Sequence, residues 1–366
     1  MHLPSDMRIA LAGALTPFDN MQDELLQVLI AGQCAIQPSE RYGAPVALMP
    51  RRERDGPITD ALAMDVATWA DIEGRPDGRR LLVYCTTKGR FDWWLAERNA
   101  GKQAKYGLFS EVAETLAVQK LHYEGFRTVS NACVSGAQGV IEAAEALLDG
   151  DCDTAVVVGS DHITEFISQG FSSLNARSSH PARPFDHTRD GLSLGEACAA
   201  VLLKRSNDPR FPRLVSYGCS NDANHISGPS QDGSGLALAI ERALDGIDKS
   251  EIRAICAHGT ATVYNDAMEA RAFHTVFEGA PPPVFGIKGA IGHTLGAAGL
   301  IEVIVSATVA TEGLIPPTVG FEQGEVNYPL DVVHGEPRKI EPGYILTTNS
   351  GFGGMNTAIV VGPGTL

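Results

Sequence analysis

Short apolar runs alternate with helical patterns along most of this chain. Several of the runs are apolar at every position, as expected for strands that are covered on both faces. The predicted strands are Arg80–Tyr84, Thr154–Val158, Ala199–Leu203, Ala254–Ala257, Val284–Gly286, Tyr344–Thr348 and Thr357–Val361. The predicted helices between them include Gly136–Leu148, Ala237–Leu244, Met268–Phe277 and Ala297–Thr311. This alternation predicts an α/β fold with buried sheets, because each sheet needs layers of helices to cover it.

Two segments look like copies of one supersecondary unit. The first, TVSNACVSGAQGVIEAAEALLDG, reads as strand, tight polar turn, small-residue helix and glycine. The second, VFGIKGAIGHTLGAAGLIEVIVSATVATEG, repeats that order, and each copy places a reactive residue, Cys133 or His293, before its helix. A chain of 366 residues also exceeds the usual size of a single hydrophobic core. We therefore predict two similar halves, at residues 1–205 and 206–366.

Charge and cysteine usage argue against several classes of protein. The net charge of −15 disfavours broad attraction to nucleic acid or to an anionic membrane. We find neither a run of about 18 apolar residues nor a basic N-terminal segment followed by a long apolar one, so we expect no bilayer span and no secretory signal. The seven cysteines are odd in number and form no CxxC pair, which favours reduced thiols in the cytoplasm and no structural zinc site.

Cys133 is the first candidate for chemistry. It lies just before a predicted helix, where the positive end of the helix dipole and free N–H groups would favour a thiolate. The small neighbours Ala132 and Gly136 would let a substrate approach closely. From this segment alone, a buried structural cysteine in a strand-to-helix turn explains the pattern equally well.

His258 is the second candidate, in the segment HGTAT that follows a predicted strand. Open α/β sheets place functional groups beyond the C-terminal ends of their strands. Thr260 and Thr262 could orient the imidazole, and Asp266 and Glu269 lie about one helical turn apart in the segment that follows. On its own, this segment is explained as well by a hydrogen-bonded structural histidine.

Two further segments are rich in small residues. Lys288 precedes His293 by five residues in KGAIGHTLGAAG, which crowds two polar side chains among closely packed backbone. A glycine-rich turn surrounds Phe352 and Gly353 between two apolar strands. No helix or lysine follows this turn as in a phosphate-binding loop. We therefore interpret it as a mobile gate or as a source of N–H groups for an oxyanion.

Taken in order, these segments resemble the β-ketoacyl-[acyl-carrier-protein] synthases, the elongating condensing enzymes of the thiolase fold. The resemblance rests on the cysteine turn, the pattern HGT-x-T-x₃-D-x₂-E, the pattern K-x₄-H followed by LGAAG, and the GFGG-x-N turn. The stretches Arg183–Asp186, Arg189–Gly191 and Gly195–Glu196 are also similar to this family. The resemblance covers the chain from about Thr128 onward and implies a layered α-β-α-β-α core made of the two halves.

The resemblance also implies a role for each candidate residue. Cys133 would carry the acyl group as a thioester, and the backbone N–H groups of Cys133 and Phe352 would stabilise the tetrahedral oxyanion. His258 and His293 would bind the carbonyl of a malonyl thioester and stabilise the enolate that decarboxylation leaves. Phe352 would also gate the acyl pocket.

Lys288, paired with Glu269, would by the same resemblance fix the geometry and electrostatics of the site and would not act as a nucleophile. No metal or organic cofactor is implied, because phosphopantetheine arrives on the carrier-protein substrate. The implied partners are an acyl carrier protein, acyl and malonyl thioesters, and a second subunit in a homodimer or in a heterodimer with a related ketosynthase-like chain. The implied pathway is fatty-acid, polyene or polyketide synthesis.

Two alternatives stay open. One is a chain-length-factor-like or decarboxylase-only partner of another ketosynthase, although such partners generally lack the cysteine. The other is a cysteine-dependent acyltransferase or hydrolase on the same scaffold, against which the presence of both histidines argues. A thiolase would carry a second reactive cysteine near the C-terminal turn, and none follows Cys256. An initiating synthase would have asparagine in place of His293.

The N-terminal third departs from the family pattern and looks shortened between the first strand, which begins near Arg8, and the strand at Arg80. Three basic residues, Arg51, Arg52 and Arg54, form the most concentrated basic cluster of the chain. They could meet an acidic carrier protein, although a solvated surface loop is the simpler explanation.

Overall fold

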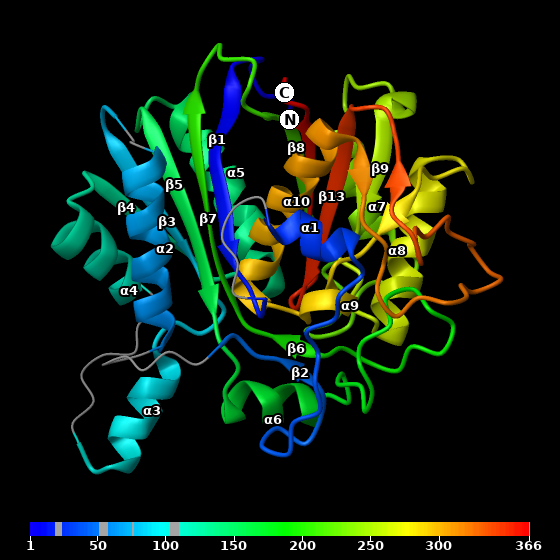
Figure 1. The fold of residues 1–366 in the computed structure, drawn as a ribbon, viewed down its shortest axis with the longest axis horizontal. Helices are drawn as coiled ribbons and strands as arrows, with labels where there is room; N and C mark the ends of the chain where they lie inside the picture. Colours follow the sequence, from blue (N-terminus) through cyan, green and yellow to red (C-terminus); the bar gives the residue numbers. More distant parts are fainter. Residues whose placement is uncertain (19–23, 51–57, 75–76, 103–109, 366) are drawn as a thin grey trace.

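The computed structural model describes residues 1–18, 24–50, 58–74, 77–102 and 110–365 (Figure 1). A mixed sheet of ten strands runs through the molecule in the order β10-β9-β13-β14-β8-β1-β7-β5-β3-β4. In chain order its strands are β1 (Met7–Leu15), β3 (Arg80–Cys85), β4 (Gly125–Val129), β5 (Thr154–Asp161), β7 (Ala197–Arg205), β8 (Arg213–Asn221), β9 (Ile252–Cys256), β10 (Val284–Phe285), β13 (Tyr344–Gly351) and β14 (Met355–Gly362). Two small sheets pair β2 (Val46–Ala47) with β6 (Leu194–Gly195) and β11 (Leu314–Ile315) with β12 (Arg338–Lys339).

The large sheet consists of two five-strand sets with the same topology. In each set the first strand of the chain pairs with the last, followed across the sheet by the fourth, second and third. The first two pairings are antiparallel and the other two are parallel in both sets. The sets meet where β1 and β8 pair at Arg8 and Arg213. Such repetition is what a duplication would produce; the boundary at residues 205 and 206, between β7 and β8, stays a prediction.

Helices cover both sets of strands. Two central helices, α5 (Ser135–Leu148) and α10 (Ala298–Glu312), pack on each other and on the inner faces of both sets. On the outer face of the first set lie α2 (Ile58–Gly74) and α4 (Ser110–Glu114), and α7 (Ser234–Ala243) and α8 (Val263–Val276) cover the second. Figure 1 shows the resulting layers, with α10 between the two sets. The predicted α-β-α-β-α arrangement is therefore confirmed.

The remaining helices are short. They are α1 (Glu24–Ile30), α3 (Phe91–Asn99), α6 (Glu165–Ser173) and α9 (Lys288–Ile291), a π-helix η1 (Thr115–Leu121), and the 3₁₀ turns η2 (Ala132–Val134), η3 (Lys249–Glu251) and η4 (Leu295–Ala297). The strands and helices expected from the sequence are all present. The prediction placed the start of α8 at Met268, but the helix begins at Val263, so Asp266 lies inside its first turn.

The two central helices approach each other closely at their N-terminal ends. A Cβ atom at Gly136 would lie 2.6 Å from the Leu300 nitrogen, and one at Gly299 would lie 2.7 Å from the Ala137 nitrogen. Only glycine fits at these two positions without displacing backbone. Each central helix also follows a left-handed residue that opens a 3₁₀ turn, Ala132 at φ 48° or Leu295 at φ 56°. The two reactive turns therefore share a local geometry and lie side by side.

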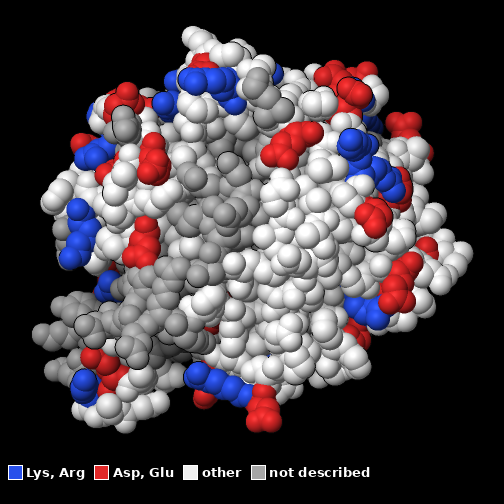
Figure 2. Space-filling view, in the orientation of Figure 1, with Lys and Arg blue, Asp and Glu red and all other residues white. Residues whose placement is uncertain are grey.

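Two surface features bear on the expectations about partners. On the face shown in Figure 2, charged side chains of the described residues lie mainly around the rim, and the centre, over α1, α9 and α10, has few of them. The described residues of this face thus form no extended basic surface. The segment Leu295–Glu312 is long and apolar enough to cross a membrane, but 83% of it is buried inside the fold, which accounts for its composition. Arg51, Arg52 and Arg54 lie outside the described residues.

Candidate active site

A cavity of about 430 Å³ is lined by residues from both halves of the chain. Its wall contains Cys133 from η2, His258 after β9 and His293 before η4. The β13–β14 turn closes one side with Phe352, and Thr260 and Thr262 also line the cavity. Sequence segments that lie far apart in the chain thus converge on one site. Among the described residues, no group of three or more His, Cys, Asp or Glu side chains is arranged to hold a metal ion.

Cys133 is 6% exposed at the floor of this cavity. Burial raises the pKa of its thiol to about 12, because desolvation disfavours the thiolate. The charge of Lys288 opposes this shift, and the carboxylates of Asp161 and Glu302 add to it. The expectation that the helix N-terminus favours a thiolate at Cys133 is therefore not met, because burial outweighs the favourable charges.

His258 is held through its Nδ1 atom. Lys288 Nζ lies 3.2 Å from this nitrogen and Asn349 Nδ2 lies 3.1 Å from it. Since both of these groups are donors, Nδ1 accepts, and the ring proton is assigned to Nε2. Burial, followed by the charge of Lys288 and then by His293, lowers the pKa of His258 well below its ordinary value. His258 is thus a neutral imidazole with a single N–H group.

His293 has the same tautomer for a different reason. The backbone N–H of Leu295 donates to His293 Nδ1 at 3.1 Å, which places its proton on Nε2. Burial and the charge of Lys288 lower the pKa of His293 well below its ordinary value. The two rings lie 5.3 Å apart at an angle of 89°. The site therefore holds two neutral imidazoles, each with an Nε2–H donor, in the same cavity wall as the thiol.

The predicted pairing of Lys288 with Glu269 is wrong. Lys288 Nζ instead forms a buried ion pair with Glu302 of α10 and donates to the His258 carbonyl oxygen at 2.6 Å. Glu302 also accepts from Asn349 Nδ2. One hydrogen-bonded network thus joins Lys288, Glu302, Asn349 and His258. In this network the ammonium group of Lys288 contacts the His258 imidazole and pairs with the Glu302 carboxylate.

Glu269 accepts hydrogen bonds from the backbone of the turn that follows β9. Its two carboxylate oxygens accept from the backbone N–H groups of His258 at 2.8 Å and Gly259 at 2.7 Å. Thr348 Oγ1 and Asn265 Nδ2 donate to the same carboxyl group. Burial, followed by the negative charge of Asp266, raises the pKa of Glu269 to about 8. Glu269 therefore fixes the position of the turn that begins at His258.

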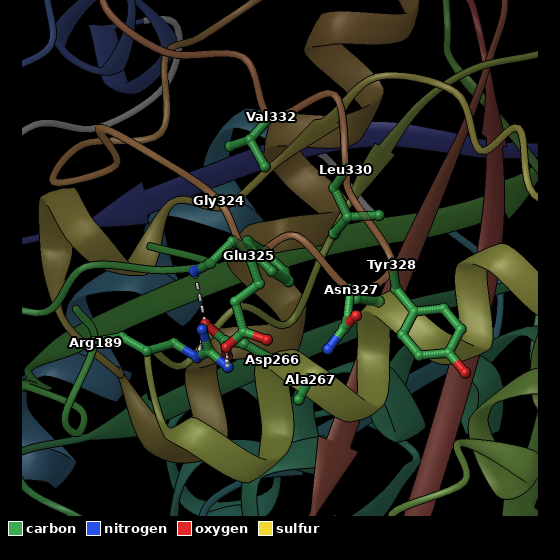
Figure 3. A pocket seen from close by; sticks show the side chains of 11 residues that line it. Arg189, Asp266, Ala267, Gly324, Glu325, Asn327, Tyr328, Leu330 and Val332 are labelled. Carbon is green, nitrogen blue, oxygen red and sulfur yellow. Dashed lines mark hydrogen bonds and ion pairs between the residues drawn. The ribbon is translucent and has the colours of Figure 1, made fainter. Parts of the chain in front are cut away.

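Asp266 holds the other end of that turn. It accepts from the backbone N–H of Ala261 at 3.2 Å and of Phe185 at 2.7 Å. Figure 3 shows a small pocket behind it, where the Arg189 guanidinium lies between Asp266, 3.9 Å away, and Glu325, 2.6 Å away. This pocket lies outside the wall that carries Cys133. Asp266 and Arg189 thus support the turn from behind.

Thr260 and Thr262 do not orient His258 as expected. Their hydroxyl groups lie 3.0 Å from each other, and Thr260 Oγ1 is 3.5 Å from Asp266 Oδ1. The orientation of the imidazole comes from Lys288 and Asn349. Because both threonines line the cavity, their remaining hydrogen-bonding capacity faces the space that a substrate would occupy.

The glycine-rich turn lies against the nucleophile. A Cβ atom at Gly351 would lie 3.3 Å from the Val134 nitrogen and 3.4 Å from the Cys133 nitrogen, so the two backbones approach closely here. Gly353, with φ 86°, donates its N–H to the Ile226 carbonyl oxygen at 2.8 Å. The Phe352 ring lies 5.6 Å from the Phe171 ring of α6. Phe352 thus lies at the wall of the cavity, next to Cys133, where a gate would be needed.

Three residues of the site were missed by the sequence analysis. They are Glu302, Asn349 and Asp161, and each has a recognisable signal. Glu302 is the one charged residue of the apolar stretch Leu300–Val305, and a charge in such a place usually has a partner. Asn349 and Asp161 each come at or near the end of a long buried strand, β13 or β5.

The comparison with protein families covers more than half of the chain. Residues 110–209 match the family model described as "Beta-ketoacyl synthase, N-terminal domain", and residues 212–322 match "Beta-ketoacyl synthase, C-terminal domain". The chain belongs to the β-ketoacyl synthase family. A 3-oxoacyl-[acyl-carrier-protein] synthase 2 of Mycobacterium leprae (strain TN) is 32% identical over 254 residues, which are 65% of this chain and 60% of that protein. The chain therefore spans about three fifths of the length of that relative.

Solved ketosynthases confirm the thiolase-like ketosynthase fold over nearly the whole chain. The structure titled "The ishigamide ketosynthase/chain length factor" is 25% identical, with a TM-score of 0.87 and 98% of each chain covered. A ketosynthase in complex with its chain length factor from Xenorhabdus doucetiae is 26% identical, with a TM-score of 0.84 and 98% of each chain covered. The family resemblance inferred from four short segments is confirmed by both comparisons.

Proposed function

We propose that this chain catalyses a decarboxylative Claisen condensation, in which an acyl thioester and malonyl-[acyl-carrier-protein] give a β-ketoacyl-[acyl-carrier-protein]. The observation that supports this best is the pair of neutral histidines, whose Nε2–H groups belong to the same cavity wall as the Cys133 thiol. A hydrolase needs one base to activate water. Two N–H donors on one side of a nucleophile suit a carbonyl oxygen that becomes an enolate.

The first step loads the acyl group on Cys133. The sulfur forms a bond to the acyl carbon, the bond to the pantetheine sulfur breaks, and the proton of the thiol leaves with the pantetheine thiolate. The backbone N–H groups of Cys133 and Phe352 stabilise the tetrahedral oxyanion in between. Because burial raises the pKa of the thiol, we expect its proton to leave as the sulfur bonds to the acyl carbon.

The second step makes the carbon–carbon bond. His258 and His293 donate to the malonyl thioester carbonyl, and loss of CO₂ leaves its electron pair in an enolate that these two hydrogen bonds stabilise. The enolate carbon attacks the acyl carbon on Cys133, and the released Cys133 thiolate takes up a proton from solvent. Burial, and after it the charge of Lys288, keeps His258 neutral. A cationic imidazole would be a stronger acid and would protonate the carbanion before it attacks.

The same proposal covers the surroundings of the reaction. We expect the phosphopantetheine arm to arrive on the acyl carrier protein, with no resident cofactor, and we expect the reaction to take place in the cytoplasm. A second subunit completes the assembly, as a homodimer or as a heterodimer with a related ketosynthase-like chain. The product enters fatty-acid, polyene or polyketide synthesis.

One observation favours a second candidate, a chain-length-factor-like or decarboxylase-only partner. The titles of two solved structures that this chain resembles name a chain length factor. Cys133 argues for the condensing enzyme, because a partner that only decarboxylates or only assists another ketosynthase needs no nucleophile to carry an acyl group.

The test is to incubate the protein with acyl- and malonyl-[acyl-carrier-protein] and to measure β-ketoacyl product by mass spectrometry, with Cys133→Ala as the control. Product from the wild-type protein and none from the variant supports the proposal. Acylated protein with hydrolysis alone would exclude condensation. Decarboxylation without acylation of Cys133 would favour the partner function.

A further inference from the structure

We propose that Asp161 is a positioning residue that holds the turn bearing His293 in register with Cys133. Asp161 ends β5 and is fully buried. It touches neither the cavity nor the reacting atoms, so it acts through its neighbours. This inference rests on the proposed function, because the position of His293 relative to Cys133 matters for the condensation step.

The geometry links the two reactive turns through this one carboxylate. The Thr86 N–H donates to the carbonyl oxygen of Val129 in β4 at 3.1 Å, and the Thr86 hydroxyl donates to Asp161 Oδ1 at 2.8 Å. On the other side, the Gly296 N–H donates to Asp161 Oδ2 at 2.9 Å. The chain from Val129 leads within four residues to Cys133.

The contact at Gly296 bears directly on His293. Gly296 follows Leu295, whose N–H fixes the His293 tautomer through Nδ1, so two successive N–H groups hold this turn. A Cβ atom at Gly296 would lie 2.7 Å from Asp161 Oδ2 and 2.8 Å from the Thr86 Cα atom. The turn therefore has no room to shift unless the carboxylate shifts with it.

The hydrogen bonds around Asp161 suit a carboxylate. Four groups donate to its two oxygens: Thr86 Oγ1, Thr87 N, Thr87 Oγ1 and Gly296 N. Burial raises the pKa of Asp161, and the charge of Lys88 and these hydrogen bonds oppose that rise without reversing it. Lys88 Nζ in turn lies 3.3 Å from His162 Nδ1. A carboxylate satisfies four donors, whereas a protonated acid would turn an O–H group toward one of them.

The charge of Asp161 gives the proposal a readout that a purely structural role would lack. Burial is the main reason that the pKa of the Cys133 thiol is raised. The negative charges of Asp161 and Glu302 raise it further, and the positive charge of Lys288 lowers it. Removing the charge should therefore make the thiol more reactive while it disturbs His293. A general loosening of the fold would also expose this buried thiol, but a stability control at another site would then show the same faster alkylation, whereas the charge effect is specific to Asp161.

The experiment compares Asp161→Asn with the wild-type protein. The asparagine amide turns N–H groups toward donors that the carboxylate satisfied, so we expect kcat for condensation to fall roughly 10- to 100-fold with KM little changed. Alkylation of Cys133 by iodoacetamide, followed on its own peptide by mass spectrometry, should be about 2- to 10-fold faster. The ¹⁵N signals of the His293 ring should change from one tautomer to a mixture. Asp186→Asn, at another fully buried carboxylate that accepts three backbone N–H groups, is the matched control for stability.

Thr86→Val and Thr86→Ser provide a second route if Asp161→Asn does not fold. Valine removes the hydroxyl that reaches Asp161, and serine keeps it, so the serine variant should recover the condensation rate that valine loses. Unchanged kcat in Asp161→Asn, or kcat and alkylation falling in parallel, would overturn the proposal. If the wild-type protein forms no β-ketoacyl product, the proposed function fails, while alkylation and the His293 ring signals still decide the role of Asp161.

Discussion

Lys288 Nζ lies 3.2 Å from His258 Nδ1 and donates at 2.6 Å to the carbonyl oxygen of the same histidine. The cation therefore fixes both the ring and the backbone of His258, and its own charge is matched by Glu302. This arrangement explains how a buried lysine supports a neutral imidazole. It also separates the functions of the two nearby glutamates, since Glu302 pairs with the cation and Glu269 holds the backbone.

The ion pair predicts a specific pattern of stability. Lys288→Met should lower the free energy of unfolding by about 3–5 kcal/mol, because it leaves Glu302 buried without its cation. The double variant Lys288→Met, Glu302→Met should recover most of that stability in urea unfolding but no condensing activity. A double variant no more stable than the single one would contradict the pairing.

The two histidines should be needed for the second step alone. We expect His258→Ala and His293→Ala each to lower the rate of decarboxylation and condensation by about 100- to 1,000-fold, the usual effect of removing one oxyanion donor. Transfer of the acyl group to Cys133 should persist in both variants, because its oxyanion is held by backbone N–H groups. Intact-protein mass spectrometry measures the acylation. Loss of acylation in either variant would mean that the histidine also serves the first step.

The state of the Cys133 thiol predicts a pH dependence. The reactive form is the thiolate, and a pKa raised to about 12 keeps its fraction small at neutral pH. Alkylation of Cys133 by iodoacetamide should therefore rise about tenfold per pH unit between pH 7 and pH 10, without a plateau. The rate is measured on the Cys133 peptide, with acyl thioester absent. An alkylation rate that reaches a plateau near pH 7 would show that Cys133 is already a thiolate at that pH.

The close approach of the central helices predicts a contrast between two glycines. Gly136→Ala should destabilise the protein by about 1–3 kcal/mol, because the new methyl group would meet the Leu300 backbone. Gly170→Ala is the matched control, since Gly170 lies in the exposed part of α6 with open space around it. Alanine there should raise stability by about 0.5–1 kcal/mol. Thermal unfolding compares the two, and equal effects would contradict the packing at Gly136.

The sequence was most informative where a pattern has one physical cause. Continuously apolar strands such as Thr154–Val158 predict burial on both faces, and the structure buries every residue of β5. β8 was missed because its sequence, RLVSYGCSN, mixes polar and small residues with few branched ones, although it lies between β14 and β1. Its place in the sheet comes from long-range pairing, which local patterns do not contain.

The partners of the site residues were harder to predict than the residues themselves. The ordered motifs singled out Cys133, His258, Lys288 and His293 as site residues. These side chains come close together only because the strands and turns that carry them end near one another in the fold. The resemblance implied Glu269 as the partner of Lys288, but three-dimensional packing brings α10 and Glu302 to it instead. Thr260 and Thr262 were assigned to His258 because they are close to it in the sequence, and the structure turns them toward each other.

The most direct test of the account is a single-turnover chase on the Cys133 thioester. The protein is loaded with an acyl group, freed of excess donor, and mixed with malonyl-[acyl-carrier-protein], while the Cys133 peptide and the carrier protein are followed by mass spectrometry. The account predicts that the acyl group leaves Cys133 at the rate at which β-ketoacyl-[acyl-carrier-protein] forms, with one CO₂ per product. Release of the acyl group as free acid, with no β-ketoacyl product, would contradict it.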